Sequence, residues 1–347
     1  MTIYINARFL SQPITGVQRY GIECSRKIKK LHPESVFLAP RDIINTSVAK
    51  ELNAICVGRN TGHLWEQKDL PAYMKNMGSG PLFNPCNTAP LFYNNNFVTL
   101  HDLAFRLHPE WNSRAFSTWY NFMVPRVIRK AKHVFTVSKT VATEISAHYN
   151  INNNNISVTY NGLSGIMQPT HPAAKEPIVL AVGSFNLRKN HESLIRAFIS
   201  SPLRSTHKLY IVGDKNKVFA DTGINEQTLL DNNITLLRQL SEQELSDLYN
   251  RAEIVASVSA YEGFGIPVLE GAANKCKLLC SDIPVYRELY GEVAHFCRPY
   301  DIADIAGSLT ELAAAKPPLT TVVNNLLEKY NYERSAATII DRMTTTG

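Results

Sequence analysis

One stretch of this chain reads Ser259-Ala260-Tyr261-Glu262-Gly263-Phe264-Gly265-Ile266-Pro267-Val268-Leu269-Glu270. It follows an apolar run, Ile254–Val258, which predicts a buried strand. Pro267 suits the first turn of a helix, because its missing N–H would have no partner there. The stretch therefore predicts a strand, a glycine-bearing loop that carries Glu262, and a helix with Glu270 about one turn inside it.

This loop and helix start predict a site for a ligand that has both a phosphate and hydroxyl groups. The start of a helix offers unpaired N–H groups and a positive dipole end, which attract an anion. Glu262 and Glu270 would repel that anion unless they accept hydrogen bonds from hydroxyls. Sugar and ribose hydroxyls are the obvious donors, so the stretch is a candidate site for a nucleotide sugar.

Length and composition predict a soluble protein of two domains. The chain has 347 residues, 44% of them hydrophobic and 19% charged, and a single core seldom serves so long a chain. No apolar run reaches the ~18 residues of a membrane span, and Met1–Asn6 predicts a first strand rather than a signal peptide.

The six cysteines lack zinc-like spacing, which favours a reduced, cytoplasmic protein. The net charge of +6 could serve a nucleic acid, an anionic membrane or a phosphorylated substrate.

Apolar runs alternate with helical patterns from end to end, which predicts an α/β fold with parallel sheets covered by helices. Helices are expected after Asn190 and after Ser241, where Ser241 and Glu244 form a capping-box pattern. The expected strands are Ile3–Ile5, Val36–Ala39, Phe97–Leu100, Val134–Val137, Ile178–Val182, Lys208–Val212, Ile254–Val258 and Lys277–Cys280.

A composition break near the middle of the chain predicts a linker. Residues 162–177 contain several prolines and glycines without an apolar period. We expect an N-terminal domain at residues 1–165, a linker at 166–177, a C-terminal domain at 178–325 and a final helical segment at 326–347, broken near Asn331.

Polar residues follow several of the predicted strands. His101 and Asp102 come after one strand, Gly183 after another, and Gly213-Asp214 after a third. Ligands of open parallel sheets bind at the carboxyl ends of strands, near a reversal of strand order. Together these residues predict a cleft lined from both domains, although Asp102 could equally cap a helix and His101 could be structural.

Two adjacent cations, Arg188 and Lys189, precede the helix expected after Asn190. Arginine holds a diphosphate by bidentate bonds and lysine acts as a point charge. A solvated charged turn is the alternative. Because Glu262 and Glu270 lie in the same half of the chain, diphosphate binding is favoured.

The chain resembles the retaining glycosyltransferases of family 4, which have the GT-B fold of two Rossmann-like domains with parallel sheets facing across a cleft. The Glu-x7-Glu pattern of Glu262 and Glu270 and the segment from Gly183 to Arg188-Lys189 carry the resemblance most specifically. Looser motifs extend it over nearly the whole chain: Thr15–Tyr20, His101-Asp102, Val137-Ser138, Asn161-Gly162, Gly213-Asp214, Leu240–Leu245 and Ser281–Pro284.

The resemblance implies roles for particular residues. Arg188 and Lys189 would neutralise the donor diphosphate and stabilise the leaving nucleotide, so that neither a metal ion nor another cofactor is expected. Glu270 would bind the ribose hydroxyls and Glu262 the transferred sugar. His101 would approach that sugar from the N-terminal domain. The other expected donor contacts are Gly16, Gly183, the base-binding segment with Arg238 and Leu240, and the backbone at Phe264 and Gly265.

The implied reaction is transfer of a sugar with retention, in which a donor phosphate oxygen assists the acceptor and neither glutamate is an acid or a nucleophile. The segment from His101 to Phe105 is similar to bacterial mannosyl- and rhamnosyltransferases of surface polysaccharide synthesis. A lipid-linked, O-antigen-like glycan acceptor is therefore expected. One departure from many relatives is the first loop, which has the single glycine Gly16 where they carry two, so the acceptor end of the site is less well defined.

Two basic groups suggest peripheral contact with the inner face of the cytoplasmic membrane, where lipid head groups are anionic. A normally solvated helix face is the alternative. The groups are Arg26, Lys27, Lys29 and Lys30, and Arg126, Arg129, Lys130 and Lys132.

Other classes of protein fit the sequence less well. A nucleotide-sugar epimerase of the same architecture and a non-catalytic nucleotide- or carbohydrate-binding protein remain alternatives. A dehydrogenase would need Gly-x-Gly-x-x-Gly after a strand, which does not occur. No helix-turn-helix or zinc pattern supports binding to nucleic acid.

Overall fold

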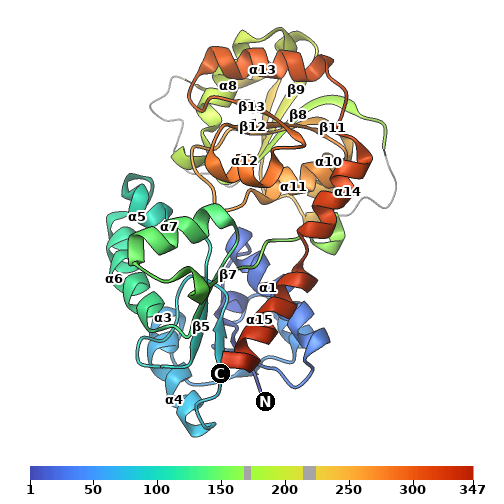
Figure 1. The fold of residues 1–347 in the computed structure, drawn as a ribbon. Coiled ribbons are helices and arrows are strands. Elements are labelled where there is room, and N and C mark those ends of the chain that lie inside the picture. The colour runs from blue at the N-terminus through green and yellow to red at the C-terminus, as the bar shows by residue number, and fades with distance from the viewer. Residues whose placement is uncertain (168–172, 214–223, 347) are drawn as a thin grey trace. The chain divides into compact units, whose positions relative to one another are not determined.

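The structure, a computed structural model, describes residues 1–167, 173–213 and 224–346. The chain divides into two compact units, which Figure 1 shows as a ribbon. Unit 1 contains residues 1–161 and 331–347, and unit 2 contains residues 162–330. The division falls a few residues from the boundaries expected at 165 and 325. Residues 168–172 of the expected linker, and Asp214 of the expected Gly213-Asp214 motif, lie outside the described residues.

Unit 1 is built on a parallel sheet of seven strands in the order β3-β2-β1-β4-β5-β6-β7. The order reverses between β1 and β4, because the chain adds β2 and β3 on one side of β1 and the later strands on the other. The strands are β1 (Tyr4–Asn6), β2 (Val36–Ala39), β3 (Ile55–Cys56), β4 (Leu82–Asn84), β5 (Asn96–Leu100), β6 (His133–Thr136) and β7 (Ile156–Val158).

The end of the chain belongs to unit 1. Its last helix, α15, packs against α1, and the rings of Tyr332 and Tyr20 meet edge to face at 6.3 Å. A break at Asn331 separates α15 from α14, as the sequence predicts. The helices of unit 1 are α1 (Gly16–Leu31), α2 (Thr46–Leu52), α3 (Gly62–Leu64), the π-helix η2 (Trp65–Asp69), α4 (Leu70–Asn76), α5 (Ala104–Leu107), α6 (Arg114–Lys130), α7 (Lys139–Tyr149) and α15 (Tyr332–Thr346), with short 3-10 turns η1 (Arg8–Ser11), η3 (Pro109–Trp111) and η4 (Asn153–Asn155).

Unit 2 repeats this plan with six parallel strands in the order β10-β9-β8-β11-β12-β13. Its reversal point lies between β8 and β11, which pair in the middle of the sheet. The strands are β8 (Glu176–Val182), β9 (Lys208–Val212), β10 (Ile234–Leu237), β11 (Ala252–Ser257), β12 (Lys277–Ser281) and β13 (Ala294–Cys297).

Helices cover both faces of this sheet. Figure 1 shows α8 and α13 on one face and α10, α11 and α12 on the other. The helices of unit 2 are α8 (His191–Ser200), α9 (Glu226–Leu230), α10 (Glu242–Arg251), α11 (Ile266–Ala273), α12 (Pro284–Tyr290), α13 (Ile302–Ala314) and α14 (Thr320–Lys329), with 3-10 turns η5 (Gly165–Met167), η6 (Leu187–Lys189) and η7 (Pro202–Ser205).

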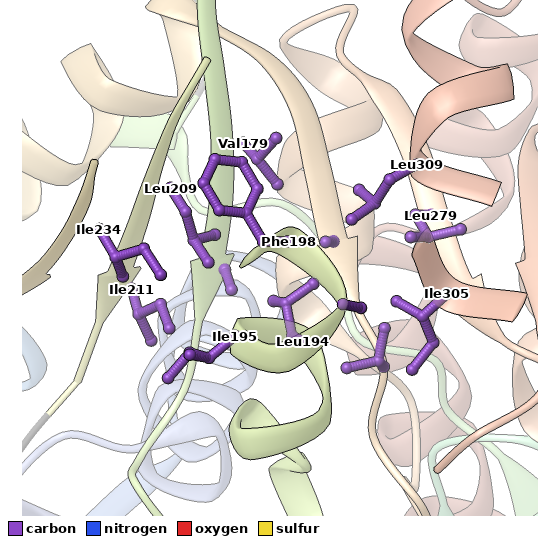
Figure 2. Packing of buried hydrophobic residues seen from close by; sticks show 14 of the residues in the cluster. Val179, Leu194, Ile195, Phe198, Leu209, Ile211, Ile234, Leu279, Ile305 and Leu309 are labelled. Atoms are coloured by element: carbon purple, nitrogen blue, oxygen red, sulfur yellow. The ribbon is translucent and has the colours of Figure 1, made fainter. Parts of the chain in front are cut away.

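The core under α8 explains why the sequence folds this way. The apolar residues of α8 recur every three or four positions, so Leu194, Ile195 and Phe198 share one face, and all three are fully buried. Figure 2 shows them packed against side chains from β8, β9 and β10 on one side and from β12 and α13 on the other. This core holds β8, and therefore the loop that follows it, in a fixed position.

The sequence-based elements agree with the structure in most respects. Each of the eight predicted runs overlaps a strand, and both halves of the capping box at Ser241 and Glu244 form at the start of α10. The sequence did not indicate β3, β4, β7, β10 or β13.

Candidate functional site

The candidate site lies at the reversal point of the sheet in unit 2. Strands β8 and β11 are hydrogen-bonded neighbours, and the helices that follow them, α8 and α11, lie on opposite faces of the sheet (Figure 1). Loops that leave in opposite directions create a crevice at the carboxyl ends of the two strands, where ligands of such sheets bind. The loop after β8 carries Arg188 and Lys189, and the loop after β11 carries Glu262.

These three charged side chains meet. The Nζ of Lys189 donates to Oε1 of Glu262 at 2.6 Å, and Nη1 of Arg188 donates to Oε2 at 3.1 Å. Glu262 is buried, whereas the side chain of Arg188 is 21% exposed and that of Lys189 12% exposed. The group thus has two cations around one carboxylate and a formal charge of +1.

The cations fix the ionisation of the carboxylate. Burial would raise the pKa of Glu262, but the charges of Arg188 and Lys189 outweigh burial and hold that pKa at about 2. Glu262 therefore carries no proton near neutral pH and cannot act there as a general acid. It can accept hydrogen bonds from hydroxyl groups.

The two loops are tied to each other through their backbones. The N–H of Ala260 donates to the carbonyl oxygen of Arg188 at 2.8 Å. Asn190 has a left-handed conformation (φ 54°), and its Nδ2 donates to the carbonyl oxygen of Val258 at 3.1 Å. Because asparagine tolerates this conformation well, it can end the 3-10 turn with the cations and start α8.

Glycine allows the close approach of two strand ends. The φ of Gly183 is +155°, and a Cβ there would lie 2.9 Å from Cε of Lys189. A Cβ on Gly213, the residue after β9, would lie 2.2 Å from the carbonyl oxygen of Gly183. Side chains at these positions would displace the lysine or the loop, so both glycines are needed for the geometry of the site.

The loop between Glu262 and α11 is held by buried aromatic rings. Gly265 has a φ of +90°, and the hydroxyl of Tyr290 donates to its carbonyl oxygen at 3.0 Å. The ring of Phe264 is buried edge to face against Tyr290 and Tyr330. The side chain of Phe264 therefore has a structural role, and the expected contact of the backbone at Phe264 and Gly265 with a donor stays a prediction.

The other predicted donor residues of unit 2 occupy the same edge of the sheet. Glu270 is buried inside α11, and Pro267 lies in the first turn of that helix, as predicted. Arg238 and Leu240 follow β10, which is two strands from β8 in the sheet, and Arg238 is exposed. The structure thus brings Arg188, Lys189 and Glu262 into contact, whereas the roles of Glu270, Arg238 and Leu240 toward a ligand stay predictions.

His101 and Gly16 belong to unit 1. His101 follows β5, is buried, and its Nε2 lies 2.8 Å from the carbonyl oxygen of Pro85. Burial lowers the pKa of His101, so its ring is neutral near neutral pH. The carboxylate of Asp102 accepts from the N–H of Ala104, the first residue of α5, at 3.0 Å, while Leu103 occupies the N-cap position of that helix. Gly16 is the first residue of α1 and is exposed.

A second buried charged group, which the sequence did not reveal, lies in unit 1. Oε1 of Glu66 accepts from Asn6 at 2.9 Å, from the hydroxyl of Thr88 at 3.0 Å and from Nε of Arg8 at 3.3 Å. Asn6 ends β1 and also donates to Asn84, which ends β4, at 3.0 Å. The group therefore lies at the reversal point of the first sheet. No local pattern could have indicated it, because Glu66 and Arg8 are far apart in the chain.

The first basic group, on α1, is largely neutralised by carboxylates. Arg26 forms ion pairs with Glu51 at 2.8 Å and with Glu23 at 2.7 Å, and Lys27 and Lys30 lie 3.8 and 4.0 Å from Glu333. An anionic surface would have to compete with these partners.

The second basic group lies among exposed aromatic rings on α6. The guanidinium of Arg126 lies 3.8 Å from the ring centre of Phe122, and Nζ of Lys130 lies 5.7 Å from that of Phe92. Phe92, Phe116, Trp119 and Phe122 are all exposed. Within the described residues, no helix is both long enough and apolar enough to span a membrane.

Comparison with known proteins gives a consistent result. Residues 95–164 match the family model "Glycosyltransferase Family 4" and residues 166–330 match "Glycosyl transferases group 1". The chain is 29% identical to O-antigen chain mannosyltransferase RfbU of Salmonella typhimurium, over 71% of this chain and 68% of that protein. It is 22% identical to O-antigen chain mannosyltransferase B of Escherichia coli, over 90% of each.

Solved structures show the same fold. Alr3699/HepE of Anabaena in complex with UDP superimposes with a TM-score of 0.76 over 99% of both chains, at 16% identity. WaaG, a glycosyltransferase involved in lipopolysaccharide biosynthesis, superimposes with a TM-score of 0.67 over 98% of this chain and 95% of that chain, at 13% identity. With its two glycosyltransferase family matches and its pair of parallel, doubly wound sheets, the chain belongs to the glycosyltransferases of the GT-B fold.

Proposed function

We propose that this glycosyltransferase moves mannose, or the related sugar rhamnose, from a nucleotide-diphosphate donor to a lipid-linked glycan acceptor during synthesis of an O-antigen-like surface polysaccharide. The transfer retains the anomeric configuration and needs no metal ion. The contact of Arg188 and Lys189 with Glu262 at the reversal point of the second sheet is the observation that carries the proposal.

The charges of this site suit a donor with a diphosphate and a sugar. The net charge of +1 attracts the diphosphate, and both cations can swing from Glu262 to phosphate oxygens as the donor arrives. They then stabilise the charge that develops on the leaving nucleotide, which is the help that a metal ion gives in other enzymes. Glu262, released from its cations, accepts hydrogen bonds from the hydroxyls of the transferred sugar.

The choice of sugar and acceptor rests on relatives. RfbU and O-antigen chain mannosyltransferase B are both mannosyltransferases of O-antigen chains by name. HepE has been crystallised with UDP and with UDP-glucose, which supports a nucleotide-diphosphate donor. The exposed aromatic and basic residues of α6 suit peripheral contact with an anionic membrane on the cytoplasmic side, where a lipid-linked acceptor would be held.

A transfer assay tests the proposal. The full chain is incubated in EDTA with GDP-, UDP-, dTDP- and ADP-sugars and with lipid-linked mannosides, and the product is analysed by mass spectrometry and by NMR of its anomeric centre. We expect transfer from one α-linked donor to give an α-linked product. An inverted product would refute retention, and activity only with added divalent ions would refute metal independence.

Variants of the site separate this function from its alternatives. Arg188→Ala with Lys189→Ala should reduce transfer at least ~100-fold, because two charge-assisted hydrogen bonds are lost. Arg196→Ala with Lys208→Ala removes the same charges from exposed positions of unit 2 and should leave transfer unchanged. A change in the donor sugar itself, without any acceptor, would instead indicate an epimerase.

A further inference from the structure

The buried carboxylate of Glu66 holds a histidine at the surface of unit 1. Oε2 of Glu66 lies 3.3 Å from Nδ1 of His63. The side chain of Glu66 is 1% exposed, whereas that of His63 is 34% exposed. Within the described residues Nε2 of His63 has no hydrogen-bond partner, so this nitrogen is left for a ligand.

An exposed indole lies beside this histidine. The ring centres of His63 and Trp119 are 5.4 Å apart, with an angle of 60° between the planes. Trp119 belongs to α6 and is 36% exposed. A hydrogen-bonding ring nitrogen and a flat apolar surface are therefore presented together.

The segment that carries His63 and Glu66 is fixed by its other side chains. Nε1 of Trp65 donates to the carbonyl oxygen of Val57 at 2.7 Å. The amide of Gln67 donates to the carbonyl oxygen of Ala89 at 3.0 Å. Glu66 lies in the π-helix η2, a rare conformation that occurs often at functional sites, and His63 lies in the short helix α3 directly before it.

Stability alone does not explain this arrangement. A buried ion pair such as that of Arg8 and Glu66 contributes little net stability, because removing both charges from water is costly. The pair instead fixes Glu66, and Glu66 fixes the ring of His63. Since the charges of Arg8 and Glu66 cancel, the group does not attract a phosphate and suits a neutral ligand.

A sugar ring matches these features. It has hydroxyl groups that can bond to Nε2 of His63 and a face of C–H groups that can pack on an indole such as Trp119. The location of the Glu66 group, at the reversal point of the first sheet, also favours a ligand site, because ligands of parallel sheets bind at such points. In unit 2 the corresponding point holds the donor site proposed above, so a separate ligand is expected in unit 1.

We propose that His63 and Trp119 form a subsite for the acceptor sugar, in which Nε2 of His63 bonds to a hydroxyl and Trp119 packs against the ring. Glu66 and Arg8 are positioning residues that orient the imidazole. The assignment of the bound sugar as the acceptor rests on the proposed function; the sugar-binding site itself does not.

Binding of simple glycosides to the full chain tests the subsite. The probes are methyl α-D-mannopyranoside, methyl α-D-glucopyranoside and methyl α-D-galactopyranoside, titrated in saturation-transfer NMR. His63→Asn places an amide nitrogen near the position of Nδ1, so it can keep the bond to Glu66 while Nε2 is lost. We expect His63→Asn to weaken binding of the preferred glycoside about three- to tenfold and Trp119→Ala to weaken it roughly tenfold or more.

A second histidine–tryptophan pair provides the control. His108 lies 3.2 Å from Glu110 and stacks on Trp111 at 3.9 Å, but the side chain of Glu110 is 60% exposed, whereas that of Glu66 is buried. His108→Asn and Trp111→Ala should leave glycoside binding unchanged. Thermal melts of each variant report whether it is folded.

The outcomes distinguish this inference from the proposed function. The subsite would be overturned, and the proposed function left standing, if nucleotide-diphosphate binding depends on Arg188 and Lys189 but glycoside binding is unchanged in the variants of His63 and Trp119. The absence of any glycoside binding by the folded wild-type protein would also overturn it. Glycoside binding that depends on His63 in a protein that binds no nucleotide would refute the function and leave the sugar site.

Discussion

Replacing Glu262 by glutamine tests both its pairing with the two cations and its proposed hydrogen bonds to the transferred sugar. The variant keeps the shape of the side chain and removes only its charge. In the structure this carboxylate is paired with Arg188 at 3.1 Å and with Lys189 at 2.6 Å. Glu262→Gln raises the formal charge of the group from +1 to +2. The affinity for a diphosphate should therefore rise, while the hydrogen bonds to the transferred sugar weaken.

The magnitudes follow from simple electrostatics. A unit charge removed from about 8 Å away changes the interaction with a phosphate charge by ~2 kcal/mol at an effective dielectric constant of about 20, which is about 30-fold in affinity. The loss of a charged acceptor for sugar hydroxyls costs about 1.5–3 kcal/mol, so transfer should fall roughly 10- to 150-fold.

The pKa of Glu262 adds a stability test. Its folded pKa of about 2 lies below the ordinary value of 4.5, so the pair stabilises the folded protein above pH 4.5, and this contribution is lost as the pH falls toward 2. The difference corresponds to about 3 kcal/mol. Urea unfolding of Glu262→Gln should show a flatter dependence on pH in that window than the wild type.

Calorimetric titration of the nucleotide diphosphate, and of the corresponding nucleotide sugar, into the wild type and Glu262→Gln measures the predicted change in affinity. Tighter binding of the diphosphate together with slower transfer is the expected result. Weaker diphosphate binding in the variant would refute the reasoning, because it would mean that Glu262 supports the phosphate site instead of competing for its cations.

Three further predictions concern two residues near the site in unit 2 and the exposed face of α6 in unit 1. Gly265→Ala should lower the unfolding free energy by about 1–3 kcal/mol, measured by urea unfolding, since φ is +90° and a Cβ would lie 2.4 Å from Cε1 of Tyr286. Burial and the charge of Lys189 lower the pKa of His191 to about 4, so between pH 6.5 and 4 the unfolded chain binds a proton that the folded protein does not. The unfolding free energy should therefore fall by about 3 kcal/mol as the pH falls from 6.5 to 4, and His191→Gln should flatten this loss. Phe122→Ser should weaken sedimentation with anionic vesicles without altering nucleotide affinity; unchanged sedimentation would exclude this face of α6 as a membrane contact.

The fold was predictable where each strand is long and buried. Ile178–Val182 is a continuous apolar run and Lys208–Val212 is apolar after its first residue, and the structure extends the first by two residues and reproduces the second. The missed strands β3, β4 and β7 have only two or three residues, too few to show a period. Such strands form because neighbouring strands supply hydrogen-bond partners, and that information is not local.

The strand ends that carry the candidate site of unit 2 were predictable, since Arg188, Lys189 and Glu262 each follow a recognisable strand. Their direct contact was not, because sequence spacing does not show that two loops meet. The Glu66 group could not be predicted at all. Its burial depends on Arg8, Asn6 and Thr88, which the fold brings together from distant parts of the chain.

The most direct test of the proposed donor site is a calorimetric titration, in EDTA, of GDP, UDP, dTDP and ADP into three proteins: the wild type, Arg188→Ala with Lys189→Ala, and the control Arg196→Ala with Lys208→Ala. One diphosphate should bind the wild type and the control equally and the site variant at least ~100-fold more weakly. Equal affinity for all three proteins, or no binding to the folded wild type, would contradict the assignment of these cations to the donor diphosphate.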